Sequence, residues 1–261
     1  MGSGNVELHP PLVLAEPSQD RDHEIFGVCR GIGLRFRGLN LVGEGMGIGG
    51  VIGLVGRKAV FPLKEETYML PHNQLRKKFH LNGLSIKYWR GVEVERPYKI
   101  MRETLSPLYI KSRWFRPFYK LLMAGRSLAM LRSRYTVIGT LGTVEARYRL
   151  GDKTVDVEIS VNPFKKISIL VANELSGRLF TTMEIDGRII NNIPPWLEVD
   201  EPVRFHSPSL RLSMHLSPVD GCKMFIGREV LGKRLDWAGA SYQLSDGVEK
   251  ISYRVSFDWS T

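Results

Sequence analysis

Cysteine is scarce in this sequence, and the few metal-binding or redox residues it has are not arranged in motifs. Cys29 and Cys222 are its two cysteines and form no C-x-x-C pair. A disulfide framework is therefore excluded, and a reducing compartment is expected, with one long-range bridge left open. The six histidines include no H-x-x-x-H or H-E-x-x-H pair. We accordingly expect neither a bound metal nor a cofactor.

The chain also lacks a long apolar run. Near its glycines, about ten residues from Met46 to Val55 are mostly apolar, well short of the roughly 20 needed to span a bilayer. Residues 1–22 lack a basic stretch before an apolar core, so they are interpreted as an N-terminal extension and not as a secretory signal. The expectation is a cytoplasmic protein, with membrane association as an open alternative.

With 43% hydrophobic residues, the chain can bury one large core. A single β-rich domain over residues 23–261 is the simplest organisation. The alternative is two β subdomains joined by a basic segment over residues 72–134.

Short β-branched and aromatic runs alternate with turn residues from about residue 134 onward. Val155, Val157, Ile159 and Val161 alternate with polar residues, which is the period of a half-buried antiparallel strand. Four turn-forming pairs predict hairpins: Gly151-Asp152, Asp186-Gly187, Asp220-Gly221 and Asp246-Gly247. Residues 187–210 contain four prolines and are expected to form an irregular connection.

These patterns predict a mainly β fold, either an antiparallel barrel similar in general shape to a lipocalin or a two-sheet sandwich. One segment has a different period. Phe118, Leu121, Leu122 and Leu128 recur at helical spacing, and Pro117 suits a first helical turn. One amphipathic helix is predicted near residues 114–132.

Seven glycines lie in residues 43–56, GEGMGIGGVIGLVG. Gly45, Gly47 and Gly50 match the G-x-G-x-x-G fingerprint of a dinucleotide cradle. The cradle requires a following helix, but Gly53 and Gly56 would each weaken such a helix by about 1 kcal/mol. We therefore interpret the stretch as extended chain, with one face that lacks side chains and admits either another backbone or a ligand. The candidate ligand-binding residues of this stretch are Gly45, Gly47 and Gly49.

Positive charge is concentrated in residues 72–134, which carry fifteen Lys or Arg against three Glu, a net +12. Aromatic residues are interleaved with these charges. Such a region suits an anionic membrane, a nucleic acid, or an ordinary solvated surface whose rings belong to the core. The membrane interpretation is favoured over nucleic acid because the densest part is the predicted helix. The candidate ligand-binding aromatics are Trp89, Tyr98, Trp114 and Phe118, and the candidate anion-binding residues are Arg113, Arg116 and Lys120.

An acidic residue in an apolar strand is the candidate catalytic group. Asp236 lies next to Trp237 in the run LDWAGASYQL, and burial would raise the pKa of its carboxyl and suit it to general-acid chemistry. Solvent exposure of Asp236 is the competing interpretation, and it is the favoured one. Trp237 and Tyr242 of the same run are further candidate ligand-binding residues.

The leading hypothesis is binding of an apolar ligand, such as a lipid or isoprenoid with an anionic head, in a cavity between β-sheets. The first alternative is an enzyme of hydratase, cyclase or isomerase type that acts on such a molecule through a buried carboxylate. The second is a nucleic-acid-binding protein. Expected partners are thus a hydrophobic small molecule and an anionic membrane surface, with the oligomeric state left open.

Overall fold

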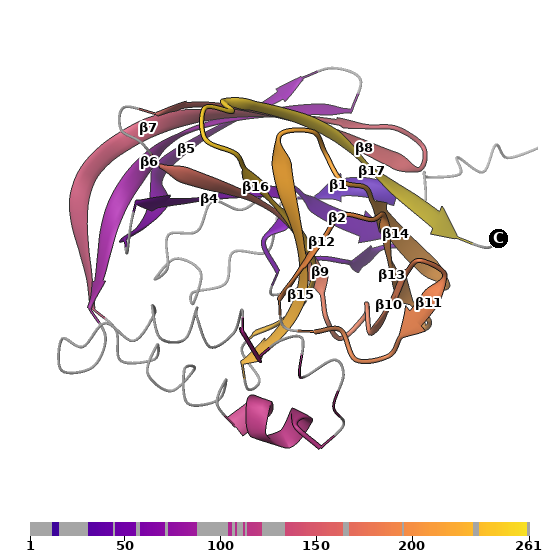
Figure 1. The fold of residues 1–261 in the computed structure, drawn as a ribbon. Helices are drawn as coiled ribbons and strands as arrows, with labels where there is room; N and C mark the ends of the chain where they lie inside the picture. Colours follow the sequence, from indigo (N-terminus) through magenta and orange to yellow (C-terminus); the bar gives the residue numbers. More distant parts are fainter. Residues whose placement is uncertain are drawn as a thin grey trace, which may run out of the picture.

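A computed structural model describes residues 12–15, 31–43, 45–55, 58–70, 73–87, 104–105, 108, 112, 114–121, 134–163, 167–194, 196–231 and 235–259. Within these ranges the chain is mainly β, with a short helix at residues 116–121 (Figure 1). The described strands are β1 (Leu12–Ala15), β2 (Gly33–Phe36), β3 (Leu39–Asn40), β4 (Gly47–Val55), β5 (Lys58–Leu70), β6 (Gln74–Lys87), β7 (Arg134–Leu150), β8 (Thr154–Pro163), β9 (Ser168–Ser176), β10 (Thr182–Ile185), β11 (Arg188–Ile190), β12 (Leu197–Val199), β13 (Val203–Ser207), β14 (Leu212–Leu216), β15 (Cys222–Leu231), β16 (Leu235–Leu244) and β17 (Lys250–Trp259).

Fourteen of these strands form one antiparallel sheet in the order β11-β10-β13-β14-β17-β8-β7-β6-β5-β4-β9-β16-β15-β12. The remaining strands, β1, β2 and β3, form a small second sheet. No described strand joins β11 to β12, so the large sheet is open and not a closed barrel. The prediction of a lipocalin-like barrel is therefore wrong, whereas the predictions of a mainly β fold and of antiparallel pairing are confirmed.

The large sheet bends so that its two halves face each other as a sandwich. We call the half made of β4, β9, β16 and β15 the β9 layer, and the half made of β7, β8, β17 and β14 the β8 layer. Side chains join the layers: the Tyr148 hydroxyl on β7 donates to the Gly49 carbonyl on β4 over 2.8 Å. The β5–β6 and β6–β7 pairings between the halves contain register shifts, and bulges of this kind bend a sheet.

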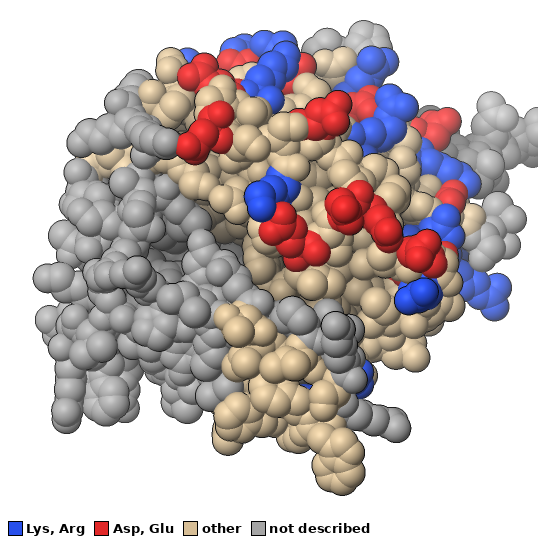
Figure 2. All heavy atoms as spheres, in the orientation of Figure 1, with Lys and Arg blue, Asp and Glu red and all other residues tan. Residues whose placement is uncertain are grey.

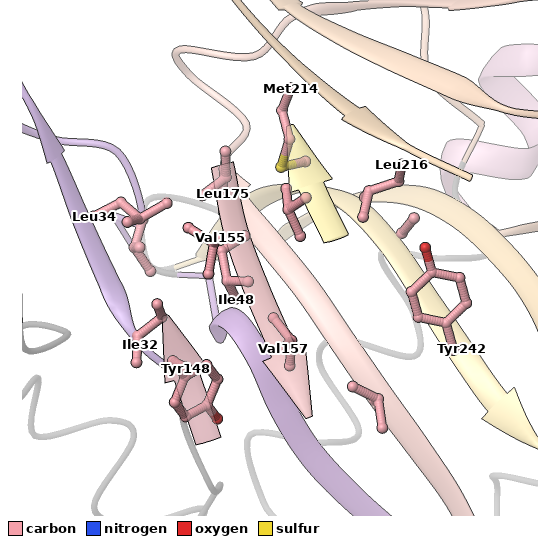
Figure 3. Packing of buried hydrophobic residues seen from close by; sticks show 14 of the residues in the cluster. Ile32, Leu34, Ile48, Tyr148, Val155, Val157, Leu175, Met214, Leu216 and Tyr242 are labelled. Carbon is pink, nitrogen blue, oxygen red and sulfur yellow. The ribbon is translucent and has the colours of Figure 1, made fainter. Parts of the chain in front are cut away.

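Period-two alternation explains which residues enter the space between the layers. On β8, Val155, Val157, Ile159 and Val161 are all buried, as their spacing predicted, while the residues between them are partly exposed. They meet fully buried side chains of the opposite layer such as Leu175 (Figure 3). Each such side chain contributes roughly 1.5–3 kcal/mol through burial.

Apolar side chains fill the interior that the described residues enclose. Ile48, Val155, Leu175 and Met214 all have no exposed surface, and in Figure 3 they pack against one another from different strands. A hollow of about 560 Å³, described below, lies on the outside of the sheet and is polar. Binding of an apolar ligand between the layers is therefore not supported.

Two of the four predicted hairpins are correct. Gly151-Asp152 joins β7 to β8 and Asp186-Gly187 joins β10 to β11, and both strand pairs are hydrogen-bonded. Asp220-Gly221 and Asp246-Gly247 are also turns, but each carries the chain from one layer to the other, because β14 does not pair with β15 and β16 does not pair with β17. The expected irregular connection over residues 187–210 is wrong in part, since it contains β11, β12 and β13.

The glycine-rich stretch forms β4, which pairs antiparallel with both β9 and β5. This confirms the interpretation as extended chain, because a dinucleotide cradle would need a parallel strand leading into a helix. The β4–β9 register shifts between Ile48 and Gly50. Gly49 therefore lies at a bulge with a φ of +71°, and a Cβ there would come within 2.7 Å of the Tyr148 ring. The glycine at this position is required by both backbone and packing.

Candidate functional site

β9 and β16 present two different faces because successive side chains of a strand point to opposite sides. Val171, Asn173 and Leu175 of β9 face the β8 layer, so Glu174 must face away from it. On β16 the pairing places Trp237, Gly239 and Ser241 on the same side as Glu174. We call this the outer face of the β9 layer, and it carries the candidate site.

Glu174 lies in a row of glycines that crosses four neighbouring strands. Gly47 of β4 pairs with Glu174 of β9, Glu174 pairs with Gly239 of β16, and Gly239 pairs with Gly227 of β15. All three glycines are buried. Glu174 is thus the one side chain in this row, and the surface beside its carboxyl consists of backbone.

Close packing of backbones accounts for two of these glycines. A Cβ on Gly47 would collide with the carbonyl oxygen of Ile32, and Gly47 has a φ of +78°. A Cβ on Gly239 would collide with the carbonyl oxygen of Asn173. The next glycine, Gly45, approaches the Glu174 backbone so closely that a Cβ would be 2.7 Å from its carbonyl oxygen. Larger residues therefore cannot replace them without moving strands.

Glu174 is a buried residue, with 7% of its surface exposed. Its Oε2 accepts a hydrogen bond from the Met46 amide over 3.0 Å. Burial raises the pKa of Glu174 to about 8, the half-buried carboxylate of Glu229 on β15 adds to the rise, and the Met46 hydrogen bond opposes it. At neutral pH the carboxyl is mostly protonated and can donate a proton.

Ser241 is the second polar group of the site. It lies on β16 two residues along from Gly239, the partner of Glu174, and such diagonal neighbours are roughly 7 Å apart. Ser241 is 1% exposed, and its Oγ has no hydrogen-bond partner among the residues that the structure describes. An unpaired buried hydroxyl is costly, which makes Ser241 a candidate hydrogen-bonding position.

The structure separates several of the predicted ligand-binding residues. Gly45, Gly47 and Trp237 lie around Glu174, and Trp237 is buried next to Ser176 in the β16–β9 register. Gly49 instead faces the β8 layer, where its amide donates to Asn173 Oδ1 over 3.1 Å. Tyr242 also points inward; its ring centroid is 4.8 Å from that of Tyr253. The predicted glycine wall is therefore divided between two faces.

Asp236 is buried and not solvent-exposed, and it is paired. Arg228 donates from Nε to Oδ1 and from Nη2 to Oδ2, both over 3.0 Å. The side chains are 12% and 25% exposed for Asp236 and Arg228, respectively. A bidentate guanidinium stabilises the ionised carboxylate, which suits a structural ion pair better than a proton donor. The catalytic role of Asp236 stays a prediction.

Sequence reasoning missed Glu174. The available signal was a single carboxyl in SILVANELS, a strand in which the alternating positions are otherwise apolar or small. Asp236 has the same kind of signal, so the sequence could not rank the two. Their difference is the arginine that faces Asp236 from β15.

The basic aromatic segment is described in part. Trp89, Tyr98 and Arg113 lie outside the described residues, as do residues 122–132 of the predicted helix. Residues 116–121 are helical, which confirms the start of that helix. Trp114 and Phe118 are exposed, as is Lys120, while Arg116 is half-buried.

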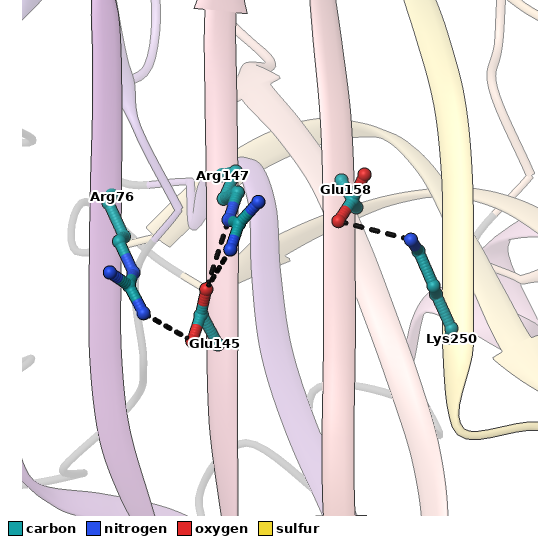
Figure 4. Close-up of polar contacts among 5 residues, drawn as sticks. All are labelled: Arg76, Glu145, Arg147, Glu158 and Lys250. Atoms are coloured by element: carbon teal, nitrogen blue, oxygen red, sulfur yellow. Dashed lines mark hydrogen bonds and ion pairs between the residues drawn. The ribbon is translucent and has the colours of Figure 1, made fainter. Parts of the chain in front are cut away.

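A second polar region covers the outside of the β8 layer. A hollow of about 560 Å³ is lined there mainly by charged and polar residues of β6, β7, β8 and β17, including Arg147, Arg149 and Arg254. Many charges on this face are already paired with neighbouring side chains. Glu145 lies between Arg76, at 2.7 Å, and Arg147, at 2.9 Å, while Glu158 pairs with Lys250 (Figure 4). Figure 2 shows a similar mixture of both signs over the upper surface, which is typical of a solvated sheet face.

Two histidines join the same polar surface farther along the sheet. His206 Nδ1 is 2.9 Å from Ser213 Oγ, and its Nε2 is 3.3 Å from Glu184 Oε2. Burial, followed by the charge of Arg204, lowers the pKa of His215.

Within the described strands, no three His, Cys, Asp or Glu side chains have the arrangement of a metal site. Cys222 has a free thiol whose pKa burial raises, and Cys29 lies outside the described residues.

Comparison with known proteins gives a low structural similarity and no family. No family model and no curated protein sequence matches the chain. A 4-alpha-glucanotransferase from Thermococcus litoralis aligns at a TM-score of 0.36 and 10% identity, over 96% of this chain and 27% of that one. The chain thus spans about a quarter of that enzyme's length.

Two proteins of similar length also align. The Slr1438 protein from Synechocystis sp. PCC 6803 gives a TM-score of 0.41 at 10% identity, over 87% of this chain and 86% of that one. A proposed aldose 1-epimerase from Escherichia coli K12 gives 0.35 at 8% identity, over 87% and 92%. Since all these TM-scores are below 0.5, they provide no basis for transferring an activity.

Proposed function

We propose that the protein is an enzyme that uses Glu174 as a general acid and base on a small uncharged molecule. The observation that carries the proposal is the row Gly47, Glu174, Gly239 and Gly227, in which a buried carboxyl is flanked by glycines and therefore by backbone atoms of neighbouring strands. A carboxyl with a pKa of about 8 is well matched to proton transfer near neutral pH.

The chemistry follows from the groups around Glu174. Protonated Glu174 donates its proton to a hydroxyl or carbonyl oxygen of the substrate, and the resulting carboxylate accepts a proton in return. Ser241 provides a hydroxyl that can hold a second oxygen of the substrate. Glu229 disfavours anionic substrates because its negative charge already raises the pKa of Glu174. Neutral molecules that need one proton added and another removed therefore fit best.

Reducing sugars and simple ketones are suitable first probes because opening a hemiacetal and enolising a ketone both need this pair of proton transfers. Wild-type protein is expected to accelerate anomer exchange, followed by polarimetry, or hydrogen exchange at the carbon beside a carbonyl, followed by NMR. Glu174→Gln should lower that rate about 100-fold or more, the usual contribution of a general acid or base. The pH profile of the wild type should change near pH 8.

Glu158→Gln is the matched control, since Glu158 is a strand carboxylate on the outside of the β8 layer and pairs with Lys250. It should keep the wild-type rate. Ser241→Ala should reduce the rate less than Glu174→Gln. The proposal is wrong if the wild type accelerates neither reaction, or if Glu174→Gln is as active as the wild type.

A further inference from the structure

The short helix at residues 116–121 has its apolar stripe turned outward. Trp114, Phe118 and Leu121 recur at positions i, i+4 and i+7 and are 93%, 53% and 71% exposed. Tyr119, on the other side of the helix, is 2% exposed. A surface helix normally buries its apolar stripe, whereas this one leaves Phe118 and Leu121 exposed together with Lys120.

The exposed stripe is held in place by local structure. The Tyr119 amide donates to the Phe115 carbonyl over 3.0 Å, and the Phe115 amide donates to the Ser112 carbonyl over 3.2 Å. The rings of Phe115 and Phe118 are 5.5 Å apart. Figure 1 shows this helix at the lower edge of the molecule, and in Figure 2 the same region is a prominence of mostly uncharged surface.

Basic residues accompany the apolar stripe. Arg116 and Lys120 lie on the helix itself, and Lys120 is exposed. Between Glu103 and Glu145 the sequence has seven Lys or Arg and no Asp or Glu. Exposed apolar side chains, together with an excess of basic residues in the surrounding sequence, are the two signals that stable binding to an anionic lipid surface requires.

We propose that residues 114–121 dock the protein on the surface of an anionic lipid bilayer. Trp114, Phe118 and Leu121 would enter the boundary between headgroups and acyl chains, where indole rings are favoured, while Lys120 would meet lipid phosphates. The segment would lie on the bilayer and not cross it, since no described helix has the length and apolar character to span one. A nucleic acid fits less well, because Leu121 offers no ring on which a base could stack.

Vesicle binding tests the proposal independently of the proposed activity. The full chain should co-sediment with vesicles of phosphatidylcholine and phosphatidylserine and much less with pure phosphatidylcholine, and 0.5 M salt should weaken binding about tenfold or more. The variant Trp114→Ala with Phe118→Ala should lose at least tenfold in affinity. Lys120→Glu should also weaken binding. Glu174→Gln should bind vesicles as the wild type does.

Ile189→Ala is the matched control, because Ile189 on β11 is 68% exposed and lies outside the helix; it should bind vesicles normally. Exposed positions contribute little to folding, and thermal unfolding of each variant verifies this. Three results would each overturn the proposal: no binding of the wild type to anionic vesicles, an equal loss in Ile189→Ala, or binding to oligonucleotides that competes fully with vesicles.

Discussion

The ionisation of Glu174 depends strongly on the fold. Its pKa rises from an ordinary value of 4.5 to about 8 on burial. Between these values the unfolded chain is ionised while the folded protein retains the proton. The stability linked to Glu174 is therefore fully present below pH 4.5 and is lost as the pH rises toward 8.

We expect Glu174→Gln to flatten this pH dependence. Relative to the wild type, the free energy of unfolding of the variant should increase by roughly 2–4 kcal/mol between pH 5 and pH 8. Urea unfolding at several pH values measures the free energy of unfolding of both proteins. The effects of other titratable groups cancel in the difference between the two. Glu158→Gln should keep the wild-type dependence. Parallel curves for wild type and Glu174→Gln would show that Glu174 is solvated in the folded protein.

Gly49 tests the packing between the two layers. Gly49→Ala must place a Cβ at a φ of +71°, 2.7 Å from the Tyr148 ring, so we expect a loss of about 3 kcal/mol or more in the free energy of unfolding. Gly187→Ala is its control, since Gly187 has a φ of +68° with nothing near its Cβ position. That change should cost only about 1 kcal/mol. Equal losses in both variants would mean that packing against Tyr148 is unimportant.

At the scale of elements, the partly buried ion pair of Arg228 and Asp236 links β15 to β16. Asp236→Leu or Arg228→Met alone should each cost about 2 kcal/mol, because each leaves one charge without its partner. The double variant should recover most of that loss. Chemical denaturation of the four proteins gives the coupling energy. If the double variant instead loses the sum of the two single losses in the free energy of unfolding, the residues do not form a structural pair. That result would favour the catalytic role predicted for Asp236.

Elements with a local signal could be predicted from the sequence. β8 follows from its alternating Val and Ile residues, and the extended form of β4 follows from glycines that weaken a helix. The connections were harder. Asp220-Gly221 closes no hairpin although Asp186-Gly187 does, because a turn pair specifies a local change of direction but not which strand the chain pairs with next.

The candidate site could not be assembled from the sequence for a related reason. Gly47, Glu174 and Gly239 become neighbours through the β4–β9 and β9–β16 pairings, which join residues more than sixty positions apart. The signal that the sequence contains for such a site is a residue of unusual type in a strand. Asp236 and Glu174 both give this signal, and only Asp236 was selected. The sequence does not show that Arg228 pairs with Asp236 in the fold.

At the scale of the whole molecule, the filled space between the layers predicts that no lipid is held there. Saturating palmitate should leave the thermal unfolding midpoint unchanged, since a ligand that binds the folded state raises it. The Trp114→Ala variant with Phe118→Ala serves as the control that removes binding at the exposed helix. A midpoint that rises with palmitate concentration in that variant would show a cavity between the layers.

The open ends of the large sheet, β11 and β12, are strands of three residues each. A second polypeptide that added itself to either end would gain very few backbone hydrogen bonds. A β-rich fold usually forms fibrils when strands of other molecules pair with its edge strands. These two edge strands are too short to support such pairing well. The molecule can remain dispersed without closing its sheet into a cylinder.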